Sequence, residues 1–244
     1  MRVLSQPAFL LHARPFRETS LVIDVFTRDY GRIGLLARGV RNPKSRKRAL
    51  VMPFQPLILG WSGKGELPLL TGLEATGSAG ELVAEQRYAA FYLNELLLKL
   101  LHRYDAHEDL FDFYSTVLQE LHQGEPVQYA LRRFEKQLLS QTGYGLILHQ
   151  EAESNRPIDA QTTYQYLPEL GPKPIPRAGH NHQGKEPGVN IRGKSLLDFH
   201  HDIFEDKESL KECRSLIRFL LDRQLSGKPL HSRQVFHQVL SNLS

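Results

Sequence analysis

Cysteine is almost absent from the sequence, which has a single one, Cys213, among 244 residues. One thiol cannot build an internal disulfide framework or a cysteine-based zinc site. The scarcity is typical of a reducing compartment, so we expect a cytoplasmic protein. Its fold must then depend on a hydrophobic core, and 41% hydrophobic residues are enough to form one.

Long apolar runs are absent as well. No stretch approaches the roughly 18 consecutive apolar residues that a membrane-spanning helix needs. Residues 1–11 lack the charged start, the apolar run and the small-residue cleavage site of a signal peptide. We therefore expect a protein that is neither secreted nor embedded in a membrane.

Acidic residues are scarce at one end of the chain. Residues 1–48 contain 11 Arg and Lys but only Glu18, Asp24 and Asp29, a local charge of +8 in a chain of net charge +4. Such asymmetry indicates a module that faces a polyanion, joined to a part with another role. The bland alternative is a charge run that only keeps a surface solvated.

The N-terminal third has the pattern of short strands. Runs rich in β-branched and aromatic residues, separated by turn residues, cover 6–13, 20–27, 32–38, 56–61 and 67–74. The turn from Arg28 to Gly31 indicates a hairpin between the second and third runs. Five short strands predict a small closed barrel of the oligonucleotide-binding type (OB-fold), although an SH3-like barrel has the same pattern.

Helical spacing begins after a glycine- and serine-containing break at 77–80. It predicts helices over 81–103, up to Gly124 and from Pro126 to about residue 140, and Asp105 with Glu108 resembles a capping box at the start of the second. Residues 150–193 are interrupted by proline and glycine, which predicts a loop with at most a short hairpin at 163–167. Helices are expected again over 195–204, 207–225 and 232–240.

These patterns define an α+β fold class. A five-stranded OB-fold barrel over 1–79 is followed by an α-helical bundle domain over 80–244. The helical parts of that domain, 80–145 and 195–244, are separated by an irregular insertion at about 150–193.

The densest cluster of positive charge runs from Arg41 to Arg48, five cations in eight residues after the third expected strand. A barrel would gather this loop with other N-terminal cations on one side. Arg and Lys in such a groove neutralise phosphates and release counterions, which favours binding of nucleic-acid backbone. The candidate DNA-binding residues are Arg14, Arg17, Arg28, Arg38, Arg41, Lys44, Arg46, Lys47 and Arg48.

Aromatic rings near these cations could stack on bases. The four candidates are Phe16, Phe26, Tyr30 and Trp61. For any one of them, a place in the barrel core is the commoner role.

Two patterns that suggest other chemistry are weak. Gly188 to Ser195 matches the phosphate-binding string G-x-x-x-x-G-K-[ST], but residues 180–187 do not indicate the buried strand that must precede it. His200 and His201 are adjacent and should diverge on a helix, and His180 and His182 lie in a loop without a nearby Cys or carboxylate. We expect no metal, and nucleotide binding stays a minor alternative.

The third expected helix has an apolar face formed by Val127, Leu131, Phe134 and Leu138, with a cationic margin beside it. An ordinary amphipathic helix is the bland interpretation. The sharper hypothesis is a pocket for an acidic peptide with an apolar terminal side chain, because cations beside an apolar groove hold both parts of such a ligand. Its candidate residues are Arg132, Arg133, Phe134 and Lys136.

A series of short motifs spans most of the chain. They are Arg14 to Ser20, Val25 to Thr27, Gly31, Ala37 to Arg41, Pro53-Phe54, Gly65 to Leu67, Tyr92 to Leu97, Leu131 to Glu135, Gly143-Tyr144 and Gly227 to Arg233. In their order and spacing, which make the match specific, these motifs resemble the RecO family of bacterial DNA repair and recombination mediators.

The resemblance implies a protein that is not an enzyme and has no cofactor. Members bind single- and double-stranded DNA, anneal complementary strands and contact the acidic, Phe-terminated tail of the single-stranded-DNA-binding protein. They pair with RecR and help to load the RecA recombinase, which implies a cytoplasmic, nucleoid-associated location. Many members carry a four-cysteine zinc site after the Gly-Tyr motif, but 149–166 contains no cysteine here, so zinc should be absent. A protein scaffold that does not bind DNA is the remaining rival.

Overall fold

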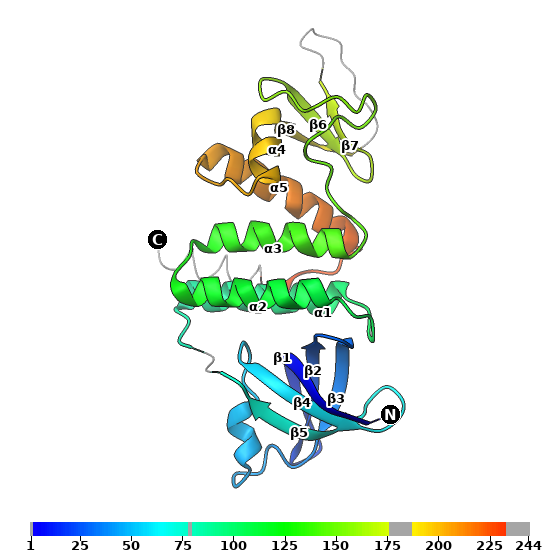
Figure 1. The fold of residues 1–244 in the computed structure, drawn as a ribbon, viewed down its shortest axis with the longest axis vertical. Coiled ribbons are helices and arrows are strands. Elements are labelled where there is room, and N and C mark those ends of the chain that lie inside the picture. The colour runs from blue at the N-terminus through cyan, green and yellow to red at the C-terminus, as the bar shows by residue number, and fades with distance from the viewer. Residues whose placement is uncertain (1, 78–79, 176–186, 233–244) are drawn as a thin grey trace. The chain divides into compact units, whose positions relative to one another are not determined.

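The structure is a computed structural model that describes residues 2–77, 80–175 and 187–232 (Figure 1). The chain forms two compact units: Met1–Val127 with Leu230–Ser244, and Gln128–Pro229. His180, His182, Arg233 and nearly all of the helix expected at 232–240 lie outside the described residues.

The first unit begins with a closed five-stranded barrel. Its strands are β1 (Arg2–Phe16), β2 (Ser20–Thr27), β3 (Gly31–Ala37), β4 (Pro56–Ser62) and β5 (Leu69–Ala75), in the order β1-β2-β3-β5-β4. Only the pairing of β3 with β5 is parallel. This order is that of an OB-fold, so the predicted barrel is confirmed and the SH3-like alternative is excluded.

The predicted hairpin between β2 and β3 is also confirmed. Leu21 pairs with Ala37 at one end of the barrel, and Thr27 pairs with Gly31 at the other. Gly31 has a φ of 63°, and a Cβ at this position would meet the Asp105 carbonyl oxygen at 1.7 Å, so the turn requires glycine. The barrel interior is apolar and closely packed, with Val25, Ile33 and Leu35 fully buried.

Two helices complete the described part of the first unit, α1 (Ala84–Leu100) and α2 (Glu108–Gln123). The start of α1 is three residues later than predicted, since the Val83 amide donates to the Gln86 side chain and forms the N-terminal cap (3.0 Å). The capping box expected from Asp105 and Glu108 is wrong, because His107 is the N-cap of α2 and its side chain makes no capping hydrogen bond. Gly124 ends α2 in a left-handed conformation, as predicted.

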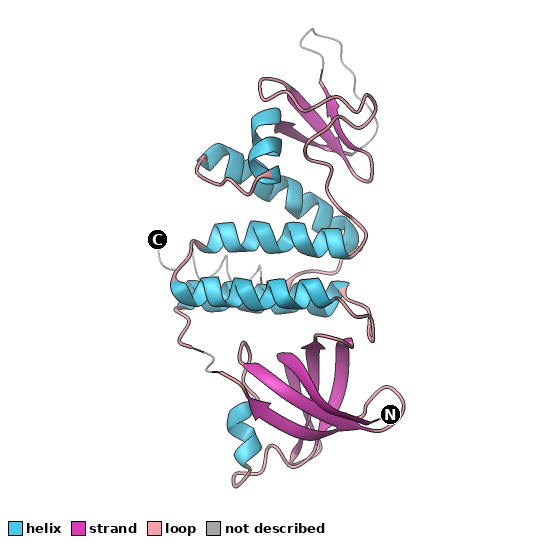
Figure 2. Cartoon of the chain, viewed as in Figure 1, coloured by secondary structure: helices cyan, strands magenta, loops and turns pink. Residues whose placement is uncertain are grey.

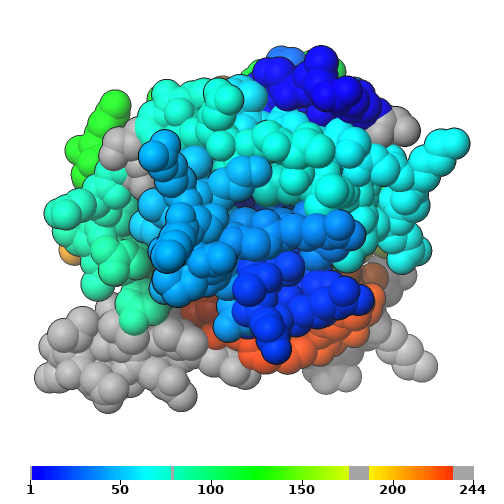
Figure 3. Space-filling model, turned by 90° about the horizontal axis from the view of Figure 1, so that it is seen from below, coloured from blue at the N-terminus to red at the C-terminus, as the bar shows by residue number. Residues whose placement is uncertain are grey.

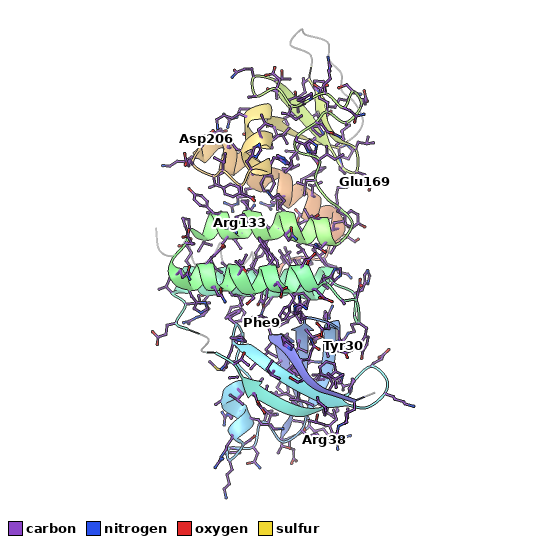
Figure 4. All side chains as sticks on the ribbon, in the orientation of Figure 1. Phe9, Tyr30, Arg38, Arg133, Glu169 and Asp206 are labelled. Atoms are coloured by element: carbon purple, nitrogen blue, oxygen red, sulfur yellow. The ribbon has the colours of Figure 1, made fainter. Side chains whose placement is uncertain are left out.

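The two helices pack against the wall formed by β1 and β2. Phe9 and Phe26 contact Phe111 and Tyr114 of α2, with ring centroids 5.1–6.3 Å apart. In the same interface, Asn94 of α1 donates to the carbonyl oxygens of Leu10 and Leu11, and the Tyr114 hydroxyl donates to Asn94. Burial raises the pKa of Tyr114. Figure 4 shows Phe9 on the side of the barrel that faces these helices. A buried aromatic and polar interface therefore joins this wall to the helices.

The second unit combines helices with a small sheet, which Figure 2 shows as the second group of magenta strands. Its helices are α3 (Val127–Gln141), α4 (Gly193–His200) and α5 (Lys207–Gln224), and its strands are β6 (Thr163–Leu167), β7 (Gly171–Pro174) and β8 (Val189–Arg192). The sheet order is β7-β6-β8, with antiparallel pairing.

The insertion is therefore more ordered than predicted. The sequence indicated a hairpin at most, whereas β8 adds a third strand to β6. A run of four residues is too short to show strand periodicity, and two prolines place β7 at an edge of the sheet, where missing amide donors are tolerated. The predicted helical bundle is divided, since α1 and α2 belong to the first unit and nearly all of α3 to the second.

Across the three described ranges, no helix combines the length and the apolarity needed to cross a bilayer.

Candidate nucleic-acid interface

The barrel topology brings two cationic segments to one end. The turn between β1 and β2 and the chain that leaves β3 meet there, because β2 and β3 are antiparallel with Leu21 opposite Ala37. The Arg41 amide donates to the Thr19 carbonyl oxygen (2.8 Å), and the Arg41 guanidinium donates to that of Arg17 (3.1 Å). Figure 3 shows the blue atoms of the turn beside the lighter blue atoms of the following segment.

We call this surface the basic end. Its eight cations are Arg14, Arg17, Arg38, Arg41, Lys44, Arg46, Lys47 and Arg48. Seven of them are exposed, and Lys47 is half-buried with its ammonium 3.5 Å from the Thr71 carbonyl oxygen. Within the described part of the chain, none of the eight forms an ion pair. Their charge is therefore available to a ligand.

The cluster from Arg41 to Arg48 is more structured than the predicted loop. Residues Arg46–Leu50 form a 3-10 helix, η1, none of whose side chains is buried. The Asn42 side chain accepts a hydrogen bond from the Lys44 amide (3.1 Å), which closes the turn before it. Together with the contact of Lys47 to β5, this local structure holds the cations against the barrel.

One aromatic ring accompanies the basic end. Phe16 is 36% exposed, and the Arg17 guanidinium lies 5.3 Å from the centre of its ring. Phe26 and Trp61 are buried, as the commoner role of such rings predicts, and Tyr30 packs edge-on against Trp61. Of the four aromatic candidates, Phe16 is thus the one that can stack on a base.

Arg28 does not join the basic end. It lies in the turn between β2 and β3, at the opposite end of the hairpin, and its guanidinium donates to both carboxylate oxygens of Asp112 (3.0 and 2.9 Å) and to Glu108 (2.9 Å). The hydrogen bond to Asp112 raises the pKa of Arg28. Its charge is neutralised within the molecule, because the barrel turn meets α2. The sequence analysis grouped Arg28 with the other DNA-binding candidates, but the structure places it apart from them.

The candidate residues on α3 have unequal exposure. Phe134 is fully buried, and Arg132 is 5% exposed and paired with Glu135 at 2.8 Å. Both side chains are buried, as are Leu131 and Leu138 of the same helix. The expected pocket therefore does not have these two side chains on its surface.

Lys136 and Arg133 lie nearer the surface of α3. The Lys136 ammonium donates to the Phe199 carbonyl oxygen (2.8 Å) and to the Asp202 carboxylate (2.6 Å), with the Phe199 ring 5.3 Å away. Arg133 is half-buried, and Figure 4 marks its place on the helix. Lys136 thus already combines a carboxylate partner with an aromatic neighbour.

A cavity of about 200 Å³ lies one turn further along α3. Its lining includes Leu139 of α3, Ile147, Tyr166 of β6, and Leu220 and Arg223 of α5. Its apolar walls suit an apolar group, and the lining carries one cation, Arg223, and one carboxylate, Glu169.

The phosphate-binding string does not have the arrangement of a phosphate-binding loop. Nearly all of residues 180–187, where the preceding strand would have to lie, are outside the described residues, and β8 occupies Val189–Arg192, the positions that the loop needs for itself. The backbone amides of Gly193 and Lys194 donate to carbonyl oxygens, and Lys194 is paired with Asp198 at 2.5 Å. The Ser195 side chain donates to Glu212. The groups that would hold phosphate are engaged elsewhere.

The histidine pair also differs from expectation. His200 and His201 were expected to diverge, yet their ring centroids are 4.7 Å apart, because α4 ends at His200 and His201 follows it as the C-cap. Burial and the neighbouring charges of His201, His149 and Lys136 lower the pKa of His200. Among the residues that the structure describes, no group of three His, Cys, Asp or Glu side chains is arranged to hold a metal ion.

Comparison with known proteins decides the family. The model described as Recombination protein O N terminal matches residues 1–79, and that of Recombination protein O C terminal matches residues 85–234. The chain belongs to the Recombination protein O family. This membership and full-length similarity to curated relatives place it among DNA repair and recombination proteins.

Three relatives of this family illustrate the similarity, each named DNA repair protein RecO. That of Nitrosococcus oceani is 44% identical over 246 residues, covering 100% of this chain and 98% of its own. That of Aromatoleum aromaticum is 43% identical, covering 98% and 97%, and that of Ralstonia nicotianae is 45% identical, covering 96% and 84%.

Proposed function

We propose that the basic end binds the phosphate backbone of single- and double-stranded DNA without reading the bases. The observation that supports this most strongly is the set of eight cations, gathered from separate segments, that have no carboxylate partner among the described residues. Cations in this state release counterions from DNA when they meet phosphates, which is the main source of sequence-independent affinity.

Phe16 gives the basic end a means to favour single strands. Unpaired bases expose their faces, and an aromatic ring between cations stacks on them regardless of sequence. Duplex DNA would use the cations alone.

Strand annealing follows from the same charges. Two complementary strands repel each other through their phosphates, and a surface of cations lowers this barrier without a covalent step. The chain acts in this proposal as a mediator and not as an enzyme, in the cytoplasm and at the nucleoid. With RecR, it helps to load the RecA recombinase on single strands.

The second part of the proposal concerns α3. We infer that the acidic, apolar-ended tail of the single-stranded-DNA-binding protein lies along this helix, at Arg133 and Lys136, with its terminal side chain in the cavity beside Leu139. In this proposal a carboxylate of the tail displaces Asp202 from the Lys136 ammonium. Arg132 and Phe134 would act from the interior, by fixing the shape of the helix.

A salt titration tests the DNA-binding surface. Fluorescence anisotropy of a labelled single-stranded oligonucleotide is measured for the wild type, for Arg46→Glu with Arg48→Glu, and for the control Lys173→Glu with Arg223→Glu. Both pairs are exposed and change the net charge equally, and Lys47 is left in place because it contacts Thr71.

We expect the first variant to lose about tenfold or more in affinity and about 1.4 in the slope of log K against log salt, or 0.7 for each lost phosphate contact. The control should keep both. Equal affinity of all three proteins would favour the alternative of a protein scaffold that does not bind DNA. A rise in Tm on addition of nucleotide and magnesium would instead favour nucleotide binding at Gly188 to Ser195.

The tail proposal needs variants that spare the buried ion pair. Arg133→Ala and Lys136→Ala should each weaken binding of a tail peptide about fivefold while DNA affinity stays the same, the order of magnitude for one charge-assisted contact. Arg132→Ala is informative only with Glu135→Ala, since the single change removes an ion-pair partner of a buried carboxylate. Parallel loss of peptide and DNA affinity would contradict two separate surfaces.

A further inference from the structure

A row of four cations runs along one face of α5. Lys207, Lys211, Arg214 and Arg218 are spaced at i, i+4, i+7 and i+11, which places them on one side of the helix. All four are exposed, whereas the opposite side of the helix buries Ser209, Cys213, Leu216, Ile217 and Leu221. We call these four residues the α5 row.

Little within the second unit neutralises this row. Over the described residues, Lys207, Lys211 and Arg214 form no ion pair, and Arg218 has only Asp222 at 3.8 Å, with both side chains more than half exposed. Glu212, on the same helix, forms an ion pair with Arg192 and accepts a hydrogen bond from the Ser195 side chain. Glu208 is exposed at the edge of the row and donates its backbone amide to the Asp206 cap.

The row also breaks two rules of helix stability. Like charges at i, i+3 and i+4 repel, and the row contains three successive pairs of this kind. Lys207 is a cation at the first residue of the helix, where the helix dipole favours an anion. The acidic residues Asp206 and Glu208 at the helix start and the exposed Arg218–Asp222 pair offset this only in part, so the row indicates a function outside the fold.

The chemistry of the face identifies the partner. The row covers about 16 Å along the helix, the length over which one strand of B-form DNA carries roughly five phosphates. A docked peptide or a membrane would need apolar anchors beside the charge, but no large exposed hydrophobic side chain lies on α5. A straight row of cations without anchors fits a phosphate backbone.

We propose that the α5 row is a second nucleic-acid contact, which binds a strand independently of the basic end. The inference builds on the proposed function, because it gives one chain two backbone sites in two different compact units. A chain with two such sites holds two strands at once, which is what annealing requires.

Stoichiometric titration separates the two sites. Full-length protein, at a concentration well above Kd in low salt, is titrated with a labelled single strand of 12 nucleotides. The proteins compared are the wild type, an α5 variant (Lys207→Gln, Lys211→Gln, Arg214→Gln, Arg218→Gln) and a basic-end variant in which five of the eight cations are reversed (Arg14→Glu, Arg38→Glu, Lys44→Glu, Arg46→Glu, Arg48→Glu). Lys173→Gln, an exposed cation of the same compact unit that lies outside the row, is the control.

Cys213 reports whether the α5 variant is folded. Its thiol is fully buried on the side of α5 opposite the row, and burial raises its pKa to about 12, so a thiol reagent should react with it only after unfolding. Comparable protection in wild type and variant establishes that a change in binding is not a loss of structure.

We expect two strands bound per chain for the wild type and the control, and one for each variant. One strand per wild-type chain, or two for the α5 variant, overturns the α5 site and leaves the basic end standing. Two strands for the basic-end variant contradict the proposed function instead. If the α5 variant loses binding of poly-glutamate but not of DNA, the partner of the row is an acidic peptide and the inference fails.

Discussion

The two ends of the OB-fold barrel carry cations from the same stretch of sequence, but over the described ranges the cations are unpaired at one end and paired with carboxylates at the other. At the basic end, Arg38 and its neighbours are exposed and have no ion-pair partner among the described residues. At the other end, Arg28 is held by Asp112 and Glu108, and Arg32 shares Asp24 with Arg103. Figure 4 shows Arg38 at the end of the barrel away from Phe9 and the helices.

The difference teaches that a count of cations does not define a binding surface. The helix-facing end needs its charges to join the barrel to α1 and α2, and each of them has a carboxylate or carbonyl partner there. None of the eight cations of the basic end forms an ion pair with the described residues, so their charges keep their capacity to bind an external anion. Which cations are free is decided by where the helices pack.

The largest effect should come from breaking the helix-facing end. Asp24→Asn leaves Arg32 and Arg103 without their shared carboxylate in a partly buried site, where losing one partner of an ion pair costs about 3 kcal/mol. The midpoint of urea unfolding should fall accordingly. DNA affinity of the folded protein at 25 °C should stay the same, and a parallel loss of affinity would mean that this end contacts DNA.

A smaller effect is expected from removing the exposed ring of the basic end. Phe16→Ala should lower affinity for single strands about tenfold, since stacking on one base contributes about 1–3 kcal/mol. The salt slope should not change, because no cation is lost. Duplex affinity serves as the control and should vary little, whereas equal losses for both forms of DNA would point to a change in the barrel itself.

Matched single substitutions compare the two ends directly. Arg38→Gln should reduce single-strand affinity about threefold and the salt slope by about 0.7, the share of one phosphate contact. Arg28→Gln should leave both within error, because its guanidinium is occupied by Asp112. Anisotropy at three salt concentrations distinguishes them, and a larger loss for Arg28 than for Arg38 would reverse the assignment of the two ends.

The smallest effect concerns a carboxylate of α1 that binds the returning chain. Burial alone would raise the pKa of Glu95, but hydrogen bonds from Ser232 and His231 outweigh it and hold the pKa below 4.5. A lowered pKa in the folded state contributes stability above pH 4.5 that is lost as the pH falls through the folded value.

Glu95→Gln should therefore lower the Tm at pH 7, and the difference from the wild type should shrink as the pH falls below 4.5 and the wild-type carboxyl becomes protonated. Thermal melts across a series of pH values from 7 downward measure this. A destabilisation that is the same at every pH would show that the loss is one of packing and not of charge.

Much of the architecture could be predicted from local patterns. Strands β2 and β4 and the hairpin at Gly31 followed from β-branched runs and turn residues, since these act over a few neighbours. The boundaries of α1 and α2 were less accurate, because the cap at His107 has no side-chain signature to find. Strand β8 was missed because its pairing with β6 is a contact between distant residues.

The sequence by itself determined the α+β class, the OB-fold barrel and the concentration of positive charge in residues 1–48, because composition and short-range periodicity carry them. Only the tertiary structure decided that Arg28 is neutralised by α2, that Phe134 and Arg132 are interior, and that Gly193 begins a helix directly after a strand. The physical reason is the same in each case. Whether a charge or a ring is available depends on partners far away in the sequence, and these are set by packing.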